Sequence, residues 1–126
     1  MKVIILLLSC SLLSVCMAHG QENPEVLLGK WKLDMSPQNP NDDNFAMMEI
    51  KSVKNNELKG TFYRPGVKLQ NGQLNMQTER LYGALESGDN SGTYNTSFYF
   101  ENGKLYGMTH AIDRGFLAVW VATKDD

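Results

Sequence analysis

Short runs in which apolar and polar residues alternate, separated by turn residues, dominate the chain after Gln21. A period of two residues is typical of strands that bury one face. The predicted strands are 27–33, 45–53, 58–63, 80–86, 93–101, 104–112 and 116–123. The stretch 67–77 contains Asn71-Gly72, a strong signal for a two-residue hairpin. It is therefore either one bent strand or a small hairpin.

Turn residues separate these runs. Pro37 and Pro40 exclude helix and inner strand from 34–44, which we predict to be a loop. Shorter turns are expected at Asn55-Asn56, Pro65-Gly66, 87–92, Asn102-Gly103 and 113–115. No segment of about ten residues or more shows helical periodicity with caps. The chain after the first twenty residues is therefore predicted to be all-β.

The number and order of the strands favour one architecture. A sheet of about eight short antiparallel strands must close or split into two layers to protect its edges. Sequential hairpins favour closure, because a Greek-key sandwich needs long crossovers. We predict a single antiparallel up-and-down β-barrel of about eight strands.

The first twenty residues have a different character. Lys2 is followed by an almost wholly apolar run from Val3 to Ala18, which is typical of a secretory signal. The run is shorter than the roughly 20 residues that span a bilayer, and Cys10 and Cys16 fit a lipoprotein site poorly. We predict a signal peptide at 1–20, a barrel domain at 21–126, and a secreted or periplasmic protein whose mature chain lacks cysteine.

Charge and chemistry exclude several function classes. The 12 basic and 14 acidic residues give a net charge of −2, without the basic excess typical of nucleic-acid binders. The domain has one histidine, His110, and no Gly-x-Ser-x-Gly motif for a nucleophilic serine. Its carboxylates lack the spacing of a calcium loop. We expect no catalytic site, no metal, no cofactor, no nucleic-acid partner and no membrane span.

Gly29-Lys30-Trp31 resembles the Gly-x-Trp opening of the calycins, a superfamily of β-barrels. In layout the chain is closest to the avidins: 58–62, 97–101, 105–115 and 119–121 are similar to avidin strands in order and spacing. The resemblance implies that Trp31 packs across the bottom of the barrel. Leu33 and Phe62 stand where avidins have biotin-contacting Asn and Tyr, so biotin is not the expected ligand. In that comparison the chain ends before an eighth strand unless 67–77 supplies one.

Several large side chains fall on the faces predicted to point inward. They are Trp31, Phe62, Tyr94, Phe98, Phe100, Phe116 and Trp120, with Leu33, Met48 and Met108 as further candidates. Eight strands enclose just enough space for side chains to fill, so these residues form either a filled core or an apolar cavity at one mouth, closed by the 34–44 loop.

These alternatives give two hypotheses. In the first, the protein binds a small apolar or amphipathic molecule through Trp31, Phe62, Phe98 and Trp120, with His110 as a polar contact. In the second, the barrel is filled and acts as an interaction or inhibitor module, or as an oligomer subunit. The outer tyrosines, available to a second copy or another protein, are Tyr63, Tyr82, Tyr99 and Tyr106. Asn95-Thr96-Ser97 also matches a glycosylation sequon.

Overall fold

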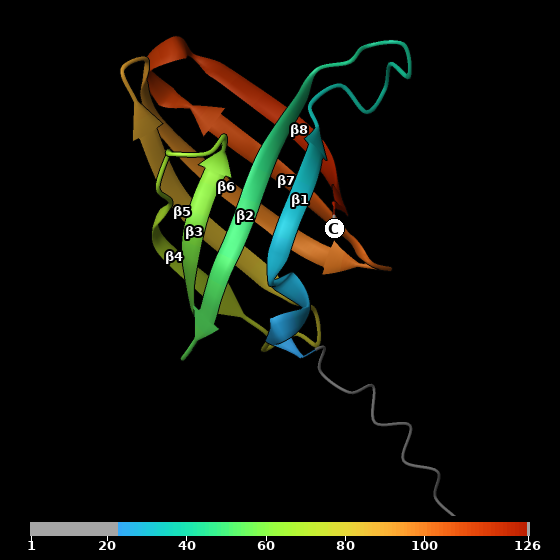
Figure 1. The fold of residues 1–126 in the computed structure, drawn as a ribbon, viewed down its shortest axis with the longest axis vertical. Coiled ribbons are helices and arrows are strands. Elements are labelled where there is room, and N and C mark those ends of the chain that lie inside the picture. The colour runs from blue at the N-terminus through green and yellow to red at the C-terminus, as the bar shows by residue number, and fades with distance from the viewer. Residues whose placement is uncertain (1–22, 126) are drawn as a thin grey trace, which may run out of the picture.

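The computed structural model describes residues 23–125, which form eight strands and two short 3₁₀ helices (Figure 1). The elements are η1 (Pro24–Leu27), β1 (Gly29–Asp34), β2 (Phe45–Lys54), β3 (Glu57–Tyr63), β4 (Gln70–Asn75), β5 (Tyr82–Asp89), β6 (Gly92–Glu101), β7 (Lys104–Ala111), η2 (Ile112–Arg114) and β8 (Phe116–Lys124). The all-β prediction is confirmed.

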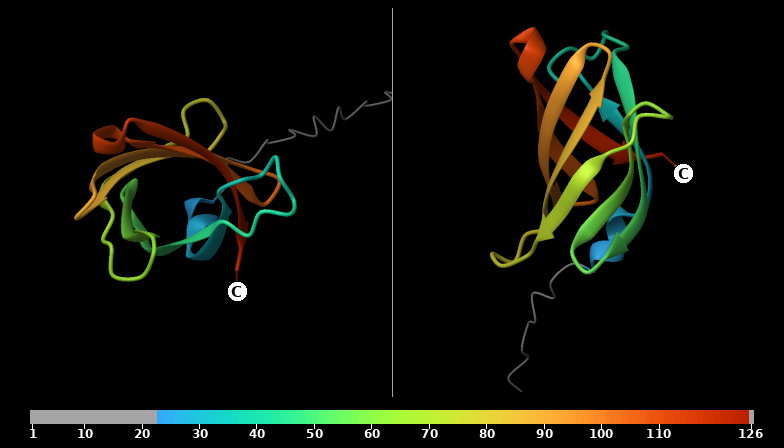
Figure 2. Two further views of the ribbon diagram at one scale, coloured as in Figure 1. Left: turned by 90° about the horizontal axis from the view of Figure 1, so that it is seen from above. Right: turned by 90° about the vertical axis from the view of Figure 1, so that its left-hand side faces the viewer.

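The strands form a closed antiparallel barrel in sequence order, from β1 to β8. Pairing of β1 with β8, from Trp31 opposite Lys124 to Asp34 opposite Val121, completes the ring, which Figure 2 shows from above. The predicted up-and-down barrel is therefore confirmed. The stretch 67–77 supplies the strand that the ring needs, as β4.

The structure differs from the predicted elements in several details, of which three have a bearing on the fold. The first strand begins at Gly29 rather than at residue 27, because the Asn23 side chain accepts a hydrogen bond from the Glu25 amide at 3.0 Å and caps η1. The fifth strand runs to Asp89, beyond its predicted end at 86. Asn71-Gly72 does not form a hairpin turn: Asn71 has a φ of 53°, and the pairing of β4 with β5 shifts register there.

A row of alternating large and small residues crosses the inside of the sheet from β5 to β8. Gly83, Phe98, Gly107 and Trp120 lie opposite one another in that order. A Cβ atom at Gly83 or Gly107 would lie 2.3 Å from the ring of Phe98 or Trp120, respectively. Each glycine therefore leaves the space that a neighbouring ring fills, which lets two large aromatic side chains share one layer.

Large side chains fill the end of the barrel that η1 covers. The Trp31 indole N–H donates to the Leu27 carbonyl at 2.8 Å, and its ring meets Phe100 edge-on at 6.5 Å. Lys124 donates to the Val26 carbonyl at 2.8 Å and lies 4.7 Å from the centre of the Trp31 ring. Trp31 thus packs across the closed end, as the Gly-x-Trp motif implies.

The predicted inward set is mostly confirmed, with two exceptions. Met108 is 47% exposed because it points outward from β7, and Phe116 is 54% exposed because it lies at the start of β8, on the open rim. The other predicted side chains are buried: Trp31, Leu33, Met48, Phe62, Tyr94, Phe98, Phe100 and Trp120.

The predicted signal segment, 1–20, lies outside the described residues. Within residues 23–125, no helix has the length and apolar character needed to cross a membrane.

We predict that Gly107→Ala destabilises the barrel by about 1–3 kcal/mol, because the new methyl group overlaps a buried ring. The Trp120 ring is fully buried and cannot move aside without disturbing its neighbours. Urea unfolding measures the change. Asn95→Ala, on the outer face of the adjacent strand, is the control and should stay within about 0.5 kcal/mol of wild type. Equal stability of the two variants would contradict this account of the glycine–aromatic row.

Candidate ligand-binding site at the barrel mouth

A cavity of about 460 Å³ opens at the end of the barrel opposite η1. Its walls come from the start of β2, the end of β3 and the adjoining ends of β6, β7 and β8, and Met35 and Asn44 of the 34–44 loop lie at its edge. The lining residues are mainly apolar. The small residues among them, Ala46, Thr109, Ala111 and Ala118, leave space between the aromatic ones, Phe45, Phe62, Tyr63, Tyr94 and Phe116. Part of the mouth is therefore open, whereas the opposite end of the barrel is filled by side chains.

Three polar groups are joined in a chain beside this cavity. The Trp120 indole N–H donates to the Thr109 hydroxyl at 3.0 Å, and the hydroxyls of Thr109 and Thr96 lie 3.0 Å apart. Trp120 is fully buried, and the two threonines are 6% and 3% exposed, respectively. The Trp120 indole belongs to the row of glycine and aromatic residues that lies beneath the cavity. Its hydrogen bond to Thr109 therefore holds the indole ring in place and also orients the Thr109 side chain.

Ser87 is a further buried hydroxyl near the mouth. It lies on the inner face of β5, opposite Tyr94 of β6, one of the residues that line the cavity. Its side chain is buried, and its oxygen has no hydrogen-bond partner among residues 23–125. An unpartnered buried hydroxyl costs free energy, so its presence at a candidate site needs an explanation.

Asp89 organises the rim at the β5–β6 turn. The hydroxyl and the backbone amide of Ser91 both donate to this carboxylate, at 2.6 and 2.8 Å, and hold the pKa of Asp89 below its ordinary value. The Tyr63 hydroxyl also donates to Asp89, and Arg64 lies 3.6 Å away. The turn is therefore held by a carboxylate whose contribution to stability is lost as pH falls through that lowered pKa.

The structure separates the predicted ligand-binding residues. Phe62 lines the mouth cavity. Trp120 and Phe98 pack beneath it, with ring centres 6.2 Å (Phe62–Trp120) and 6.4 Å (Phe98–Trp120) apart. Trp31 lies at the closed end against η1, and His110 is exposed on the outer face of β7. Phe62 and Phe98 thus both pack against Trp120 in one cluster, from which Trp31 and His110 are absent.

The polar residues of the mouth were missed by the sequence-based prediction. Thr96 alternates in register with Tyr94 and Phe98, so its inward position could be read from the pattern. A hydroxyl among inward aromatic residues is the signal that could have identified it. Nothing in the sequence pairs Thr96 with Thr109, because that contact depends on the register of β6 against β7.

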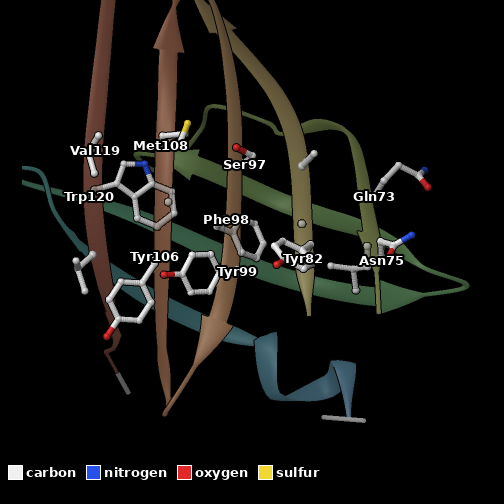
Figure 3. A pocket seen from close by; sticks show the side chains of 15 residues that line it. Gln73, Asn75, Tyr82, Ser97, Phe98, Tyr99, Tyr106, Met108, Val119 and Trp120 are labelled. Carbon is white, nitrogen blue, oxygen red and sulfur yellow. The ribbon is translucent and has the colours of Figure 1, made fainter. Parts of the chain in front are cut away.

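A second feature lies outside the barrel, on the sheet formed by β4 to β8. Tyr82, Tyr99 and Tyr106 stand side by side on the outer face (Figure 3), with ring centres 6.1 and 5.2 Å apart along the row. They border a groove of about 760 Å³. Tyr63, predicted to be on the outer faces as well, instead packs against Phe62 and Tyr94 at the mouth.

Within the same described range, no cluster of three or more His, Cys, Asp or Glu side chains could hold a metal ion. No protein-family model, curated protein or solved structure matches this chain.

We predict that Ser87→Ala leaves the protein as stable as wild type or stabilises it by about 1 kcal/mol, because it removes a buried hydroxyl without a partner. Thr109→Val should instead destabilise it by about 1–3 kcal/mol, because the Trp120 indole N–H loses its acceptor. Thermal and urea unfolding measure both changes, and Ser97→Ala controls for the Ser-to-Ala exchange in a strand. A clear loss of stability in Ser87→Ala would mean that Ser87 has a partner in the folded protein.

Proposed function

We propose that the protein binds a small apolar or amphipathic molecule in the mouth of the barrel. The observation that carries the proposal is the cavity of about 460 Å³ at the mouth. Ala111 and Ala118 leave space there beside the rings of Phe62 and Tyr94, whereas Trp31 packs across the closed end. A concave, mainly apolar site with a few polar groups is the usual form of a small-molecule site.

The physical chemistry of such a site is simple. Burial of apolar ligand surface supplies affinity at about 25 cal/mol per Å², and no proton transfer is needed. Leu33 and Phe62 are buried and apolar, so they offer no hydrogen bond to the ureido group of biotin. The Gly-x-Trp motif and the position of Trp31 at the closed end support a calycin-like protein. With the expected signal peptide, it would act outside the cytoplasm.

The two tryptophans of the chain give a direct test, because Trp31 lies at the closed end whereas Trp120 lies beneath the mouth cavity, bonded to Thr109, which lines it. We predict that p-cresol, added at millimolar concentration to ¹⁵N-labelled protein, shifts the indole N–H signal of Trp120 and leaves that of Trp31 in place. The aromatic probe enters beside the Trp120–Thr109 bond, whereas Trp31 is covered by η1. Two-dimensional NMR records both signals in one titration.

A variant that fills the cavity provides the matched test. Ala118→Leu should weaken p-cresol binding at least about fivefold, since it removes space from the mouth. Ala84→Leu adds the same group on the outer face and should leave binding unchanged. An unshifted Trp31 signal in Ala118→Leu shows that the barrel is intact. Equal p-cresol shifts of both indoles, or unchanged affinity in Ala118→Leu, would contradict a mouth site.

The exposed outer sheet supports a second candidate function, pairing with a second copy of this chain. Two adjacent outward rows over β5–β8 carry no charge: Tyr82, Tyr99, Tyr106 and Val121, then Ala84, Ser97, Met108 and Val119. Charged residues flank these rows: Asp34 lies opposite Val121 at the end of the tyrosine row, Glu86 is the next outward residue after Ala84 on β5, and Arg80 and Glu101 pair with each other at 3.2 Å. The uncharged rows of two copies can therefore meet without charge repulsion between them.

The arrangement of small and projecting side chains on this face also favours self-association. Ala84 and Ser97 are small and line the groove, whereas Met108 and Val119 beside them are 47% and 58% exposed. A two-fold axis places the projecting residues of one copy over the small residues of the other, as an isologous interface requires. The two rows contain eight residues, fewer than the roughly 20 that each partner contributes to an interface of standard size, so the dimer expected here has a small interface.

We predict that native mass spectrometry of the wild-type protein shows a dimer and that Val119→Glu converts it to monomer, because a charge is then buried without a partner. Thr123→Glu, on the same strand outside the uncharged rows, is the control and should remain dimeric. A monomeric wild type, or dissociation by both variants, would rule out this face as the interface.

A further inference from the structure

The hydrogen bonds beside the mouth cavity leave one donor without an acceptor. Trp120, Thr109 and Thr96 carry three polar hydrogens, one on the indole nitrogen and one on each hydroxyl. The indole hydrogen is used on Thr109, and the two hydroxyls share one bond between them. One hydroxyl hydrogen therefore has no acceptor among residues 23–125.

The direction of the Thr96–Thr109 hydrogen bond determines which of the two hydroxyls carries the hydrogen without an acceptor. If Thr96 donates to Thr109, the Thr109 oxygen accepts twice, from Thr96 and from the indole, so both of its lone pairs are occupied. The Thr109 hydroxyl can then only donate. Thr109 is also the member of the chain that lines the cavity. In this arrangement a molecule in the mouth meets a donor with no remaining capacity to accept. In the reverse arrangement Thr109 donates to Thr96 and the free hydrogen lies on Thr96, so a ligand that accepts from Thr109 selects the first arrangement.

We propose that the mouth takes a neutral molecule with a carbonyl oxygen at its inner end and an apolar body, and that Thr109 sets this specificity. The inference rests on the ligand-binding function proposed above. The carbonyl accepts the free hydroxyl hydrogen, while Phe62 and Ala118 contact the apolar body. Ser87, buried without a partner one row nearer the mouth, adds a second hydroxyl on this side of the barrel.

A carboxylate does not fit the same position. Within the described chain, Arg114 is the charged residue that lines the cavity, and it lies at the rim, in η2. A negative charge at Thr109 would be desolvated without a cation beside it, which is costly. A ligand that entered tail first, with an anionic head at Arg114, would leave the free hydroxyl unpaired. A neutral acceptor satisfies the inner donor without a buried charge.

Three probes of nearly equal shape separate these possibilities: acetophenone, α-methylstyrene and benzoate. They carry a neutral acceptor, no acceptor and an anionic acceptor on the same ring. We expect acetophenone to bind about fivefold more tightly than α-methylstyrene, measured from the Trp120 indole shift. A purely apolar cavity would show the opposite order, because desolvating a carbonyl without a hydrogen bond is unfavourable. Benzoate should bind more weakly than acetophenone.

Two matched substitutions assign the donor. Thr109→Val should remove the preference for acetophenone and leave α-methylstyrene binding unchanged, because its methyl group replaces the hydroxyl and shields the indole N–H. Thr96→Val should keep the preference, since Thr109 still accepts from Trp120 and can still donate. The Trp31 signal monitors folding in both variants.

The outcomes distinguish this inference from the function on which it rests. If acetophenone and α-methylstyrene bind equally, or if Thr109→Val keeps the preference, the carbonyl specificity is wrong and the apolar mouth site stands. If benzoate binds most tightly, the ligand is anionic and the neutral class is wrong. If none of the three probes shifts the Trp120 signal at millimolar concentration, the proposed function itself fails.

Discussion

The position of the Trp120 ring is the constraint on which the rest of the barrel depends. The ring is fully buried, packs against Phe62 and Phe98, and occupies the space that Gly107 leaves. Its nitrogen must also find an acceptor, because a buried indole N–H without one is costly. Thr109 meets that need from the adjacent strand. A single residue thus couples the packing of the core to the polarity of the mouth.

The bond between Trp120 and Thr109 joins a packed core to a cavity within the same small barrel. An eight-stranded ring holds about as much side-chain volume as its interior can accept. Here large residues such as Trp31 and Phe100 fill the end near η1, whereas at the opposite end small residues such as Ala111 and Ala118 leave space beside the aromatic ones.

Much of the fold could be predicted from the sequence, because inward and outward residues alternate in most strands and Asn102-Gly103 marks its turn. The pattern could not predict η1, since its start depends on the Asn23 cap. It also could not separate a hairpin from the bulge at Asn71 and Gly72. The candidate site was harder to predict. The Thr96–Thr109 pair depends on strand register, and nothing in the local pattern places Trp31 at the closed end and Trp120 beneath the mouth cavity.

The contacts at the closed end have one further consequence. Lys124 donates to the carbonyl of Val26, and the Asp125 amide donates to the carbonyl of Lys30 at 2.8 Å, so both ends of the described chain lie near η1. The mouth is at the opposite end of the barrel. A linker joined at either end would hold the molecule by its base, with the cavity directed away from the point of attachment. Immobilised on a sensor surface in this way, the barrel would keep its opening accessible to solvent.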